Sequence, residues 1–138
     1  MNNEITDMLV ARAESAREKS YCPYSSFAVG AALLTEDGEV YTGSNIENAA
    51  FTPTVCAERV AISSAVHSGK RNFIAIAVVG GRHGEPISSI TPPCGVCRQV
   101  MAEFCRPDFK IILSDGKKRV IYTLEELMPL GFNGASLA

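Results

Sequence analysis

Residues 72–80, NFIAIAVVG, place the strongest constraint on the fold, because hydrophobic residues follow one another almost without interruption. A strand with one solvated face alternates hydrophobic and polar residues, whereas a strand covered on both faces is hydrophobic throughout. The run is also far shorter than the ~20 residues that cross a bilayer. It therefore predicts an inner strand of a sheet that is covered by helices on both faces.

The segments around this strand supply the other elements. Hydrophobic periodicity and end signals indicate helices at residues 4–19, 55–67 and 91–104, and a short last helix opened by a capping box from Thr123 to Glu126. Further strands are expected at residues 27–35, 39–45, 109–115 and 119–123. In the third helix we expect Pro92 and Pro93 in the first turn. This order predicts one α/β domain over residues 1–138.

Composition and charge exclude several classes of protein. Thirteen Lys and Arg against fifteen Asp and Glu give a formal charge of -2, which provides no field for gathering a nucleic acid. We see no export signal at the N-terminus and no hydrophobic run of membrane-spanning length, so we expect a cytoplasmic protein with neither a nucleic-acid nor a membrane partner. Five cysteines, an odd number, do not indicate a disulfide framework.

Three of these cysteines stand at predicted helix starts: Cys56 in the second helix, and Cys94 and Cys97 in the third. The C-x-x-C spacing puts two sulfurs on the same side of a helix. A helix N-terminus favours anions and lowers the pKa of a thiol, so thiolates form there readily. Three thiolates between two helix ends indicate a zinc site.

The function of such a site depends on its fourth coordination position, which protein fills in a structural site and water occupies in a catalytic one. His67 lies about 16 Å along the helix from Cys56, whereas His83 remains open as the ligand of a structural Cys3His module. Glu58 either reaches a zinc-bound water or only complements the helix dipole. Arg59 either withdraws charge from a ligand sulfur or forms a surface salt bridge.

Four motifs in combination resemble the small homotetrameric cytidine deaminases: SSFAVGAAL, GSNIENA, VCAERVAI and PCGVCRQVM. The similarity runs from about residue 21 to residue 132. It implies a three-layer cytidine-deaminase-like fold with a five-stranded mixed sheet. It also implies hydrolysis of cytidine and 2'-deoxycytidine to uridine and 2'-deoxyuridine in pyrimidine salvage, with release of ammonia, by a homotetramer with shared active sites.

The resemblance also implies roles for individual residues. Cys56, Cys94 and Cys97 would hold one zinc ion per chain, which activates a water molecule. Glu58 would transfer the protons, and Arg59 would compensate the charge of the thiolates. The residues that would contact the nucleoside are Phe27 on the pyrimidine, Asn45 and Glu47 on the ribose, Ala57 on the base through its backbone, and Phe132 from a neighbouring subunit.

The residue types alone do not decide between two roles for Asn45 and Glu47. They are either polar residues at the end of a strand or side chains that bind the ribose hydroxyls. We expect the Glu47 carboxylate to be buried and to repel a 5'-phosphate, which favours a nucleoside over a nucleotide. Phe51 departs from the family pattern, because many relatives carry a tyrosine there.

Other functions remain open at this point. A blasticidin-type nucleoside deaminase shares the cysteines and the glutamate, and a structural zinc module would use His83. A polynucleotide deaminase would need a basic or aromatic binding surface, which is not evident. Residues 114–118, SDGKK, are too few for a parallel crossover, so we expect the last two strands to be antiparallel, as in the free-nucleoside branch.

Overall fold

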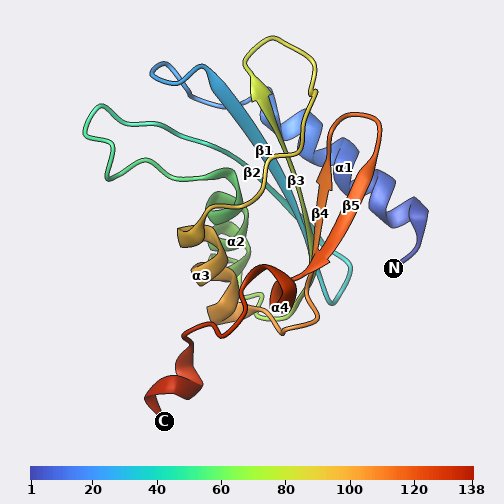
Figure 1. Cartoon of the computed structure of the whole chain (residues 1–138), viewed down its shortest axis with the longest axis vertical. Coiled ribbons are helices and arrows are strands. Elements are labelled where there is room, and N and C mark those ends of the chain that lie inside the picture. The colour runs from blue at the N-terminus through green and yellow to red at the C-terminus, as the bar shows by residue number, and fades with distance from the viewer.

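The computed structural model describes residues 1–138 and contains one five-stranded sheet (Figure 1). The strands are β1 (Phe27–Thr35), β2 (Val40–Ser44), β3 (Phe73–Arg82), β4 (Lys110–Ser114) and β5 (Arg119–Thr123). The helices are α1 (Asn3–Arg17), α2 (Ala57–His67), α3 (Gly95–Phe104) and α4 (Leu124–Leu127), and a 3-10 helix at Gly134–Leu137 ends the chain.

The sheet is mixed, with the strand order β2-β1-β3-β4-β5. Strand β1 pairs antiparallel with β2 and β3, and β3 pairs parallel with β4. The last two strands are antiparallel, with Lys110 opposite Thr123 and Leu113 opposite Val120. The predicted α/β fold with a mixed five-stranded sheet and an antiparallel last pair is therefore confirmed.

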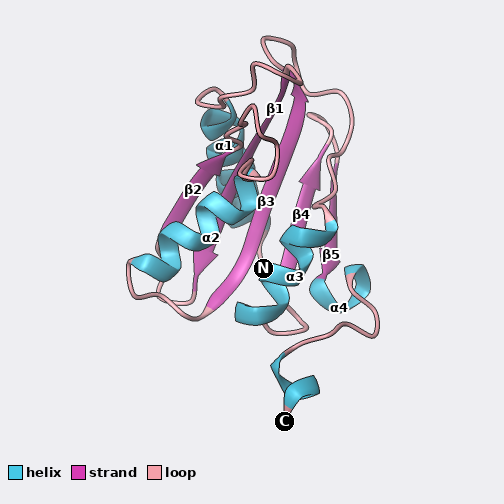
Figure 2. Ribbon diagram, turned by 90° about the vertical axis from the view of Figure 1, so that its left-hand side faces the viewer, coloured by secondary structure: helices cyan, strands magenta, loops and turns pink.

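Helices cover both faces of the sheet, as Figure 2 shows for α2 and α3 in front and α1 behind. One core cluster joins α1 to residues of β3 such as Ala77 and Val79, and the other joins α2 and α3 to Ile76 and Val78. Residues 75–79 all have an exposed fraction of 0%. The continuous hydrophobic run thus forms the central strand, because each of its faces meets a separate core.

The helix starts deviate slightly from the sequence prediction. Helix α2 begins at Ala57, with Cys56 as the N-cap, and α3 begins at Gly95, with Cys94 as the N-cap. The prolines at positions 92 and 93 therefore precede α3 and do not lie in its first turn. The capping box of Thr123 and Glu126 forms as predicted.

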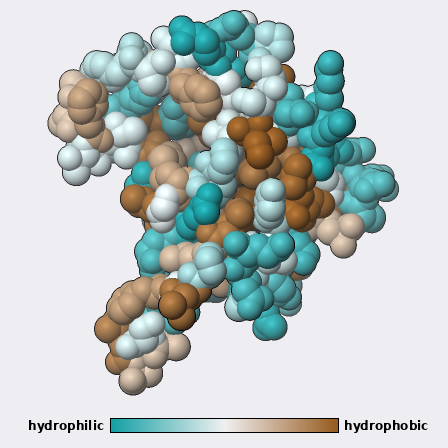
Figure 3. Space-filling view, in the orientation of Figure 1, coloured by the Kyte–Doolittle hydropathy of each residue, from teal (hydrophilic) through white to brown (hydrophobic).

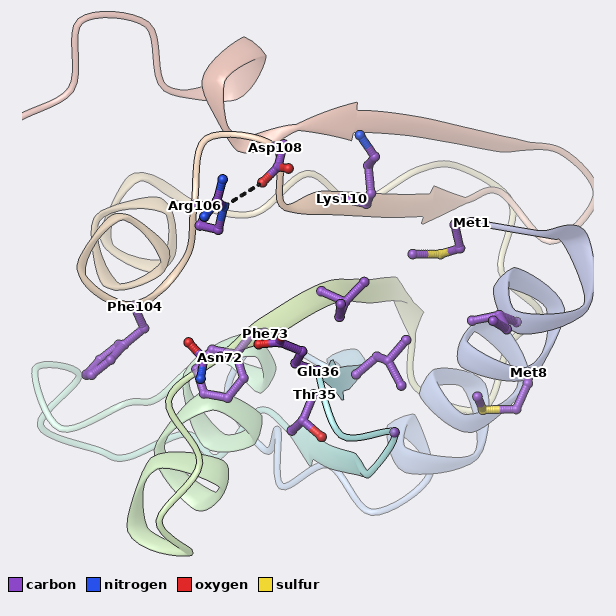
Figure 4. A pocket seen from close by; sticks show the side chains of 14 residues that line it. Met1, Met8, Thr35, Glu36, Asn72, Phe73, Phe104, Arg106, Asp108 and Lys110 are labelled. Atoms are coloured by element: carbon purple, nitrogen blue, oxygen red, sulfur yellow. Dashed lines mark ion pairs between the residues drawn. The ribbon is translucent and has the colours of Figure 1, made fainter.

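A cavity of about 760 Å³ lies at the end of the sheet where β1 finishes and β3 and β4 begin. Figure 4 shows Met1, which precedes α1, together with Met8 of α1, Phe104 of α3 and Lys110 of β4 around it. The N-termini of α2 and α3 lie at the other end, so this cavity is separate from the cysteine cluster. No helix combines the length and hydrophobicity needed to cross a membrane.

Candidate active site

Three cysteine sulfurs converge between the N-termini of α2 and α3. Cys56 Sγ lies 3.8 Å from Cys94 Sγ, and Cys94 Sγ lies 3.5 Å from Cys97 Sγ. All three sulfurs lie within 4.8 Å of one another. Because a Zn–S bond measures ~2.3 Å, sulfurs at the corners of a tetrahedral site stand ~3.8 Å apart. The spacing of the three sulfurs therefore fits a zinc ion.

The charge environment of the cluster also suits a cation with thiolate ligands. Neither N-cap cysteine makes a side-chain capping bond, so both helix ends keep unpaired backbone N–H groups. Hydrogen bonds from Cys97 and from Arg59 lower the pKa of Cys56 to about 5, although burial opposes them. Cys56 and burial raise the pKa of Cys97, since adjacent thiols do not all ionise without a cation. Zinc removes that obstacle, and it is the cofactor that this donor set fits.

Glu58, the second residue of α2, lies beside the cluster without belonging to it. Its exposed fraction is 4%, and burial raises its pKa to about 7. No histidine or carboxylate joins the three sulfurs, and His83 is exposed in the turn after β3. The Cys3His module therefore lacks its fourth ligand, and one tetrahedral position stays available to a ligand other than protein.

Arg59 contacts the cluster directly. Its Nη2 donates to Cys56 Sγ over 3.4 Å, and the partner sulfur raises the pKa of the guanidinium. The Nε atom of Arg59 is buried and makes no hydrogen bond. The sequence left Arg59 open between a contact to a cysteine sulfur and a surface salt bridge. The structure contains the contact to the sulfur, and Arg59 forms no salt bridge.

The segment that carries Asn45 and Glu47 runs beside the first cysteine. Ile46 and Val55 form an antiparallel bridge, and both of its N–H to O distances are 3.0 Å. Val55 immediately precedes Cys56. The bridge therefore places the segment of Asn45 and Glu47 next to Cys56, at one end of the sheet.

Asn45 and Phe27 are joined to each other. Asn45 Nδ2 donates to the carbonyl of Phe27 over 2.8 Å, and its Oδ1 accepts from the N–H of Val29 over 2.9 Å. An amide has a second N–H and a second lone pair, so each end keeps capacity for a ligand. The ring of Phe27 lies against β3, where a Cβ on Gly80 would stand 3.1 Å from it. A Cβ at position 80 would also stand 2.6 Å from Thr91 Oγ1, so glycine here lets both side chains lie close against β3.

Glu47 lines a cavity of about 420 Å³ at the same end of the sheet. Its other lining residues are Tyr24, Ser25, Phe51 and Thr54. Hydrogen bonds from the Ser25 hydroxyl and from the N–H groups of Ser25 and Tyr24 lower the pKa of Glu47. The prediction of a buried carboxylate is wrong, because Glu47 is only partly covered where the cavity opens to solvent.

The two remaining predicted contact residues differ in position. Ala57 is the first residue of α2 and is fully buried, and an N–H at this position has no intrahelical acceptor. Phe132 follows α4, has an exposed fraction of 58% and accepts a hydrogen bond from Gln99 at its carbonyl oxygen. It does not line the cavity beside Glu47 of its own chain.

Two residues support this end of the molecule that the sequence interpretation did not single out. Arg98 donates over 2.8 Å from Nε to Pro93 O and from Nη1 to Leu127 O, so it ties the segment before Cys94 to α4. Its place directly after the C-x-x-C motif was an available signal. Ser25 binds Glu47, and no periodicity or spacing in the sequence connects these two residues.

A zinc ion on three thiolates, with a free coordination position and a buried glutamate beside it, defines the zinc-dependent deaminases as a class. A family model for the cytidine and deoxycytidylate deaminase zinc-binding region matches residues 3–113. The chain belongs to this family.

Known relatives are similar to this chain over nearly its whole length. The chain is 47% identical over 133 residues to a cytidine deaminase of Sporosarcina psychrophila, covering 96% of this chain and 94% of that protein. It is 48% identical over 132 residues to a cytidine deaminase of Halalkalibacterium halodurans, covering 94% and 96%. The crystal structure of a cytidine deaminase from Burkholderia pseudomallei is 43% identical, with a TM-score of 0.84 over 96% of this chain and all of that one.

Proposed function

We propose that this chain hydrolyses cytidine and 2'-deoxycytidine to uridine and 2'-deoxyuridine with release of ammonia. The observation that carries the proposal is the cluster of Cys56, Cys94 and Cys97 with no fourth protein ligand and with Glu58 buried beside it. The named activity of the relatives supports the same substrate class. Conversion of cytidine to uridine is a pyrimidine salvage reaction, which we propose as the setting.

Glu58 carries the protons of this reaction. When bound, zinc polarises a water molecule and so supplies the nucleophile at neutral pH. The Glu58 carboxylate accepts a proton as the water oxygen adds to C4 of the base, and it delivers that proton to N3. The second proton of the water passes through Glu58 to the amino group on C4. The C4–N bond then breaks, ammonia leaves, and C4 becomes the carbonyl carbon of the product.

Arg59 and Ala57 assist at the start of α2. Three thiolates and one Zn²⁺ leave a net negative charge, which weakens the electrophile. The hydrogen bond from Arg59 to Cys56 Sγ draws part of that charge away. The N–H of Ala57 lacks an intrahelical acceptor, and we propose that it donates a hydrogen bond to an acceptor atom of the base.

Phe27, Asn45 and Glu47 recognise the nucleoside. The ring of Phe27 is partly exposed and supplies a flat surface for the pyrimidine. Asn45 keeps a free N–H, and Glu47 keeps one lone pair, on Oε2, that can accept from a ribose hydroxyl. The negative charge of Glu47 disfavours a 5'-phosphate in the same cavity. These contacts support a nucleoside substrate over a nucleotide.

The C-terminal segment supports a homotetramer in which neighbouring chains share active sites. Three large hydrophobic residues, Leu130, Phe132 and Leu137, are more than half exposed. Figure 3 shows hydrophobic side chains gathered on the terminal segment where it projects from the body. Light scattering on the purified protein tests this proposal, and an active monomer would contradict the role of Phe132 on a neighbouring site.

The experiment that tests the function follows the loss of ultraviolet absorbance of cytidine, 2'-deoxycytidine and CMP, with metal content determined on the same sample. We expect turnover of both nucleosides, little turnover of CMP and about one zinc per chain. The Glu58→Gln variant should keep its zinc and its fold but lose a factor of at least ~1,000 in kcat.

Glu4→Gln is the matched control, because Glu4 is also an acid in the first turn of a helix but is exposed on α1. It should behave as the parent protein. Stoichiometric zinc without turnover would indicate a structural metal module. Turnover of blasticidin S in place of cytidine would indicate the other nucleoside deaminase.

A further inference from the structure

The hydroxyl of Ser25 lies between two of the residues that recognise the nucleoside. Its Oγ donates to Glu47 Oε2, and it accepts from the N–H of Phe27 over 2.9 Å. The N–H groups of Tyr24 and Ser25 donate to the other carboxylate oxygen, Oε1, over 2.9 and 3.1 Å. One side chain therefore connects the carboxylate of Glu47 to the backbone of Phe27.

The direction of each hydrogen bond is fixed by chemistry. An N–H can only donate, so the bond from Phe27 occupies a lone pair of the Ser25 oxygen. The single hydroxyl hydrogen of Ser25 is then free to point at Glu47, which as a carboxylate can only accept. Alanine or valine at position 25 would break both bonds.

The backbone holds Ser25 in this place. Ser26 has a φ of 58°, in the left-handed region, and the chain therefore turns sharply between Ser25 and Phe27. A serine hydroxyl that accepts from the N–H two residues later is a common feature of such turns. The N–H of Ser26 donates to the carbonyl of Cys22 over 3.0 Å, which closes the turn from the other side.

The lone pairs of the carboxylate show what remains for a ligand. Each oxygen of Glu47 accepts about two hydrogen bonds. The two N–H donors fill Oε1, whereas Ser25 takes one place on Oε2 and leaves one. The cavity of about 420 Å³ that Glu47 lines is the space into which this place can open.

We propose that Ser25 is a positioning residue that orients Glu47 Oε2 toward a sugar hydroxyl of the substrate and holds it in register with Phe27. The proposal rests on the sugar-binding role of Glu47 set out above. Without the Ser25 hydroxyl, Glu47 keeps its two N–H donors on Oε1 and stays in the cavity, but its carboxylate can rotate about that anchor. Binding of the sugar then weakens, whereas the chemistry at C4 does not change.

The test compares substrates with and without the 2'- and 3'-hydroxyls of the sugar. Ser25→Ala should raise KM for cytidine about tenfold and change kcat less than about threefold, because one charge-assisted hydrogen bond is lost. With 2',3'-dideoxycytidine, which lacks the 2'- and 3'-hydroxyls and keeps only the 5'-hydroxyl, parent and variant should have KM values within about twofold of each other. A general loss of folding would affect both substrates alike.

A pair of variants of equal shape isolates the hydroxyl. Ser25→Thr keeps it and should have nearly the parent KM for cytidine, whereas Ser25→Val should repeat the defect of Ser25→Ala. Ser20→Ala is the control for the loss of a serine hydroxyl, because Ser20 bonds only to Arg17 O and Val29 O. It should leave the ratio of the two substrates unchanged.

The outcomes separate the two proposals. A parent protein without turnover of cytidine would remove the proposed function itself. With an active parent, an equal loss on both substrates, a fall in kcat alone or a Ser25→Thr variant as impaired as Ser25→Val would overturn the role of Ser25. Failure of both Ser25→Ala and Ser25→Val to fold would assign Ser25 a structural role and overturn it too.

Discussion

The contact between β2 and the start of α2 predicts that Gly43→Ala impairs catalysis. A Cβ at position 43 would stand 2.4 Å from the carbonyl oxygen of Ala57 and 2.7 Å from the N–H nitrogen of Ala61. Ordinary contacts of a Cβ begin at 3.4 Å. Since both neighbours are backbone atoms, no side chain can move aside, and the first turn of α2 must recede by about 1 Å, the difference between 2.4 and 3.4 Å.

This displacement has two consequences of different size. Overpacking of a well-packed interface costs about 1–3 kcal/mol of unfolding free energy, which leaves most molecules of a typical domain folded. Cys56 and Glu58 lie on the displaced turn, however, and a 1 Å misplacement of reacting groups costs ~100-fold in rate. We therefore expect kcat/KM for cytidine to fall about 100-fold in a protein that still folds.

The assay combines turnover with two measurements of integrity, the denaturant midpoint and the zinc content. Gly134→Ala is the matched control, because a Cβ at Gly134 would meet no atom within 4 Å. The control should have the parent's kcat/KM. A Gly43→Ala protein with kcat/KM within about threefold of the parent would refute the argument that the position of α2 on β2 sets the geometry of the site.

Two further predictions concern charges at the site. Arg59→Gln removes the donor to Cys56 Sγ, so kcat should fall about 10- to 100-fold with zinc content unchanged, and loss of the zinc itself would contradict a charge-compensating role. The pKa of Glu47 lies below its usual range because of Ser25 and two N–H groups, so the charged form persists as pH falls and its contribution to stability and binding is lost only in acid. KM for cytidine should therefore stay constant from about pH 8 to pH 5 and rise below that, and a rise that begins near neutral pH would contradict this assignment.

The fold was predictable where one segment carried its own signal. The run at residues 72–80 became the central strand β3, because a strand with two hydrophobic faces can be covered only in the middle of a layered structure. The capping box at Thr123 formed, since its two hydrogen bonds involve residues three positions apart. The antiparallel last pair followed from the length of the link alone.

The metal cluster was predictable for a related reason. Each cysteine stood at a helix start that local patterns located to within two residues for α2 and four for α3, and a helix N-terminus gives a thiolate a defined place and charge environment. The sequence did not predict which helix ends lie next to one another in the folded chain. The meeting of α2 and α3 depends on the sheet order, and that order follows from the packing of the whole chain.

The substrate end was less predictable because its contacts join loops and not elements. Asn45 was expected to face a ligand, yet its amide also bridges the carbonyl of Phe27 and the N–H of Val29. Glu47 was expected to be buried, yet it is partly exposed and held by a serine 22 residues earlier in the chain. Contacts between irregular segments leave no periodic trace in a sequence.

This division between helix ends and loops has a physical consequence for specificity. Cys56, Glu58 and Cys94 are fixed by two helices, α2 and α3, that pack in the same core, so substitutions that move them also cost stability. Glu47 is held by hydrogen bonds from an exposed turn, and changes there, at Ser25 above all, alter the sugar contacts without disturbing either core. Discrimination among nucleosides can therefore change by substitutions in the turn while the deamination chemistry stays the same.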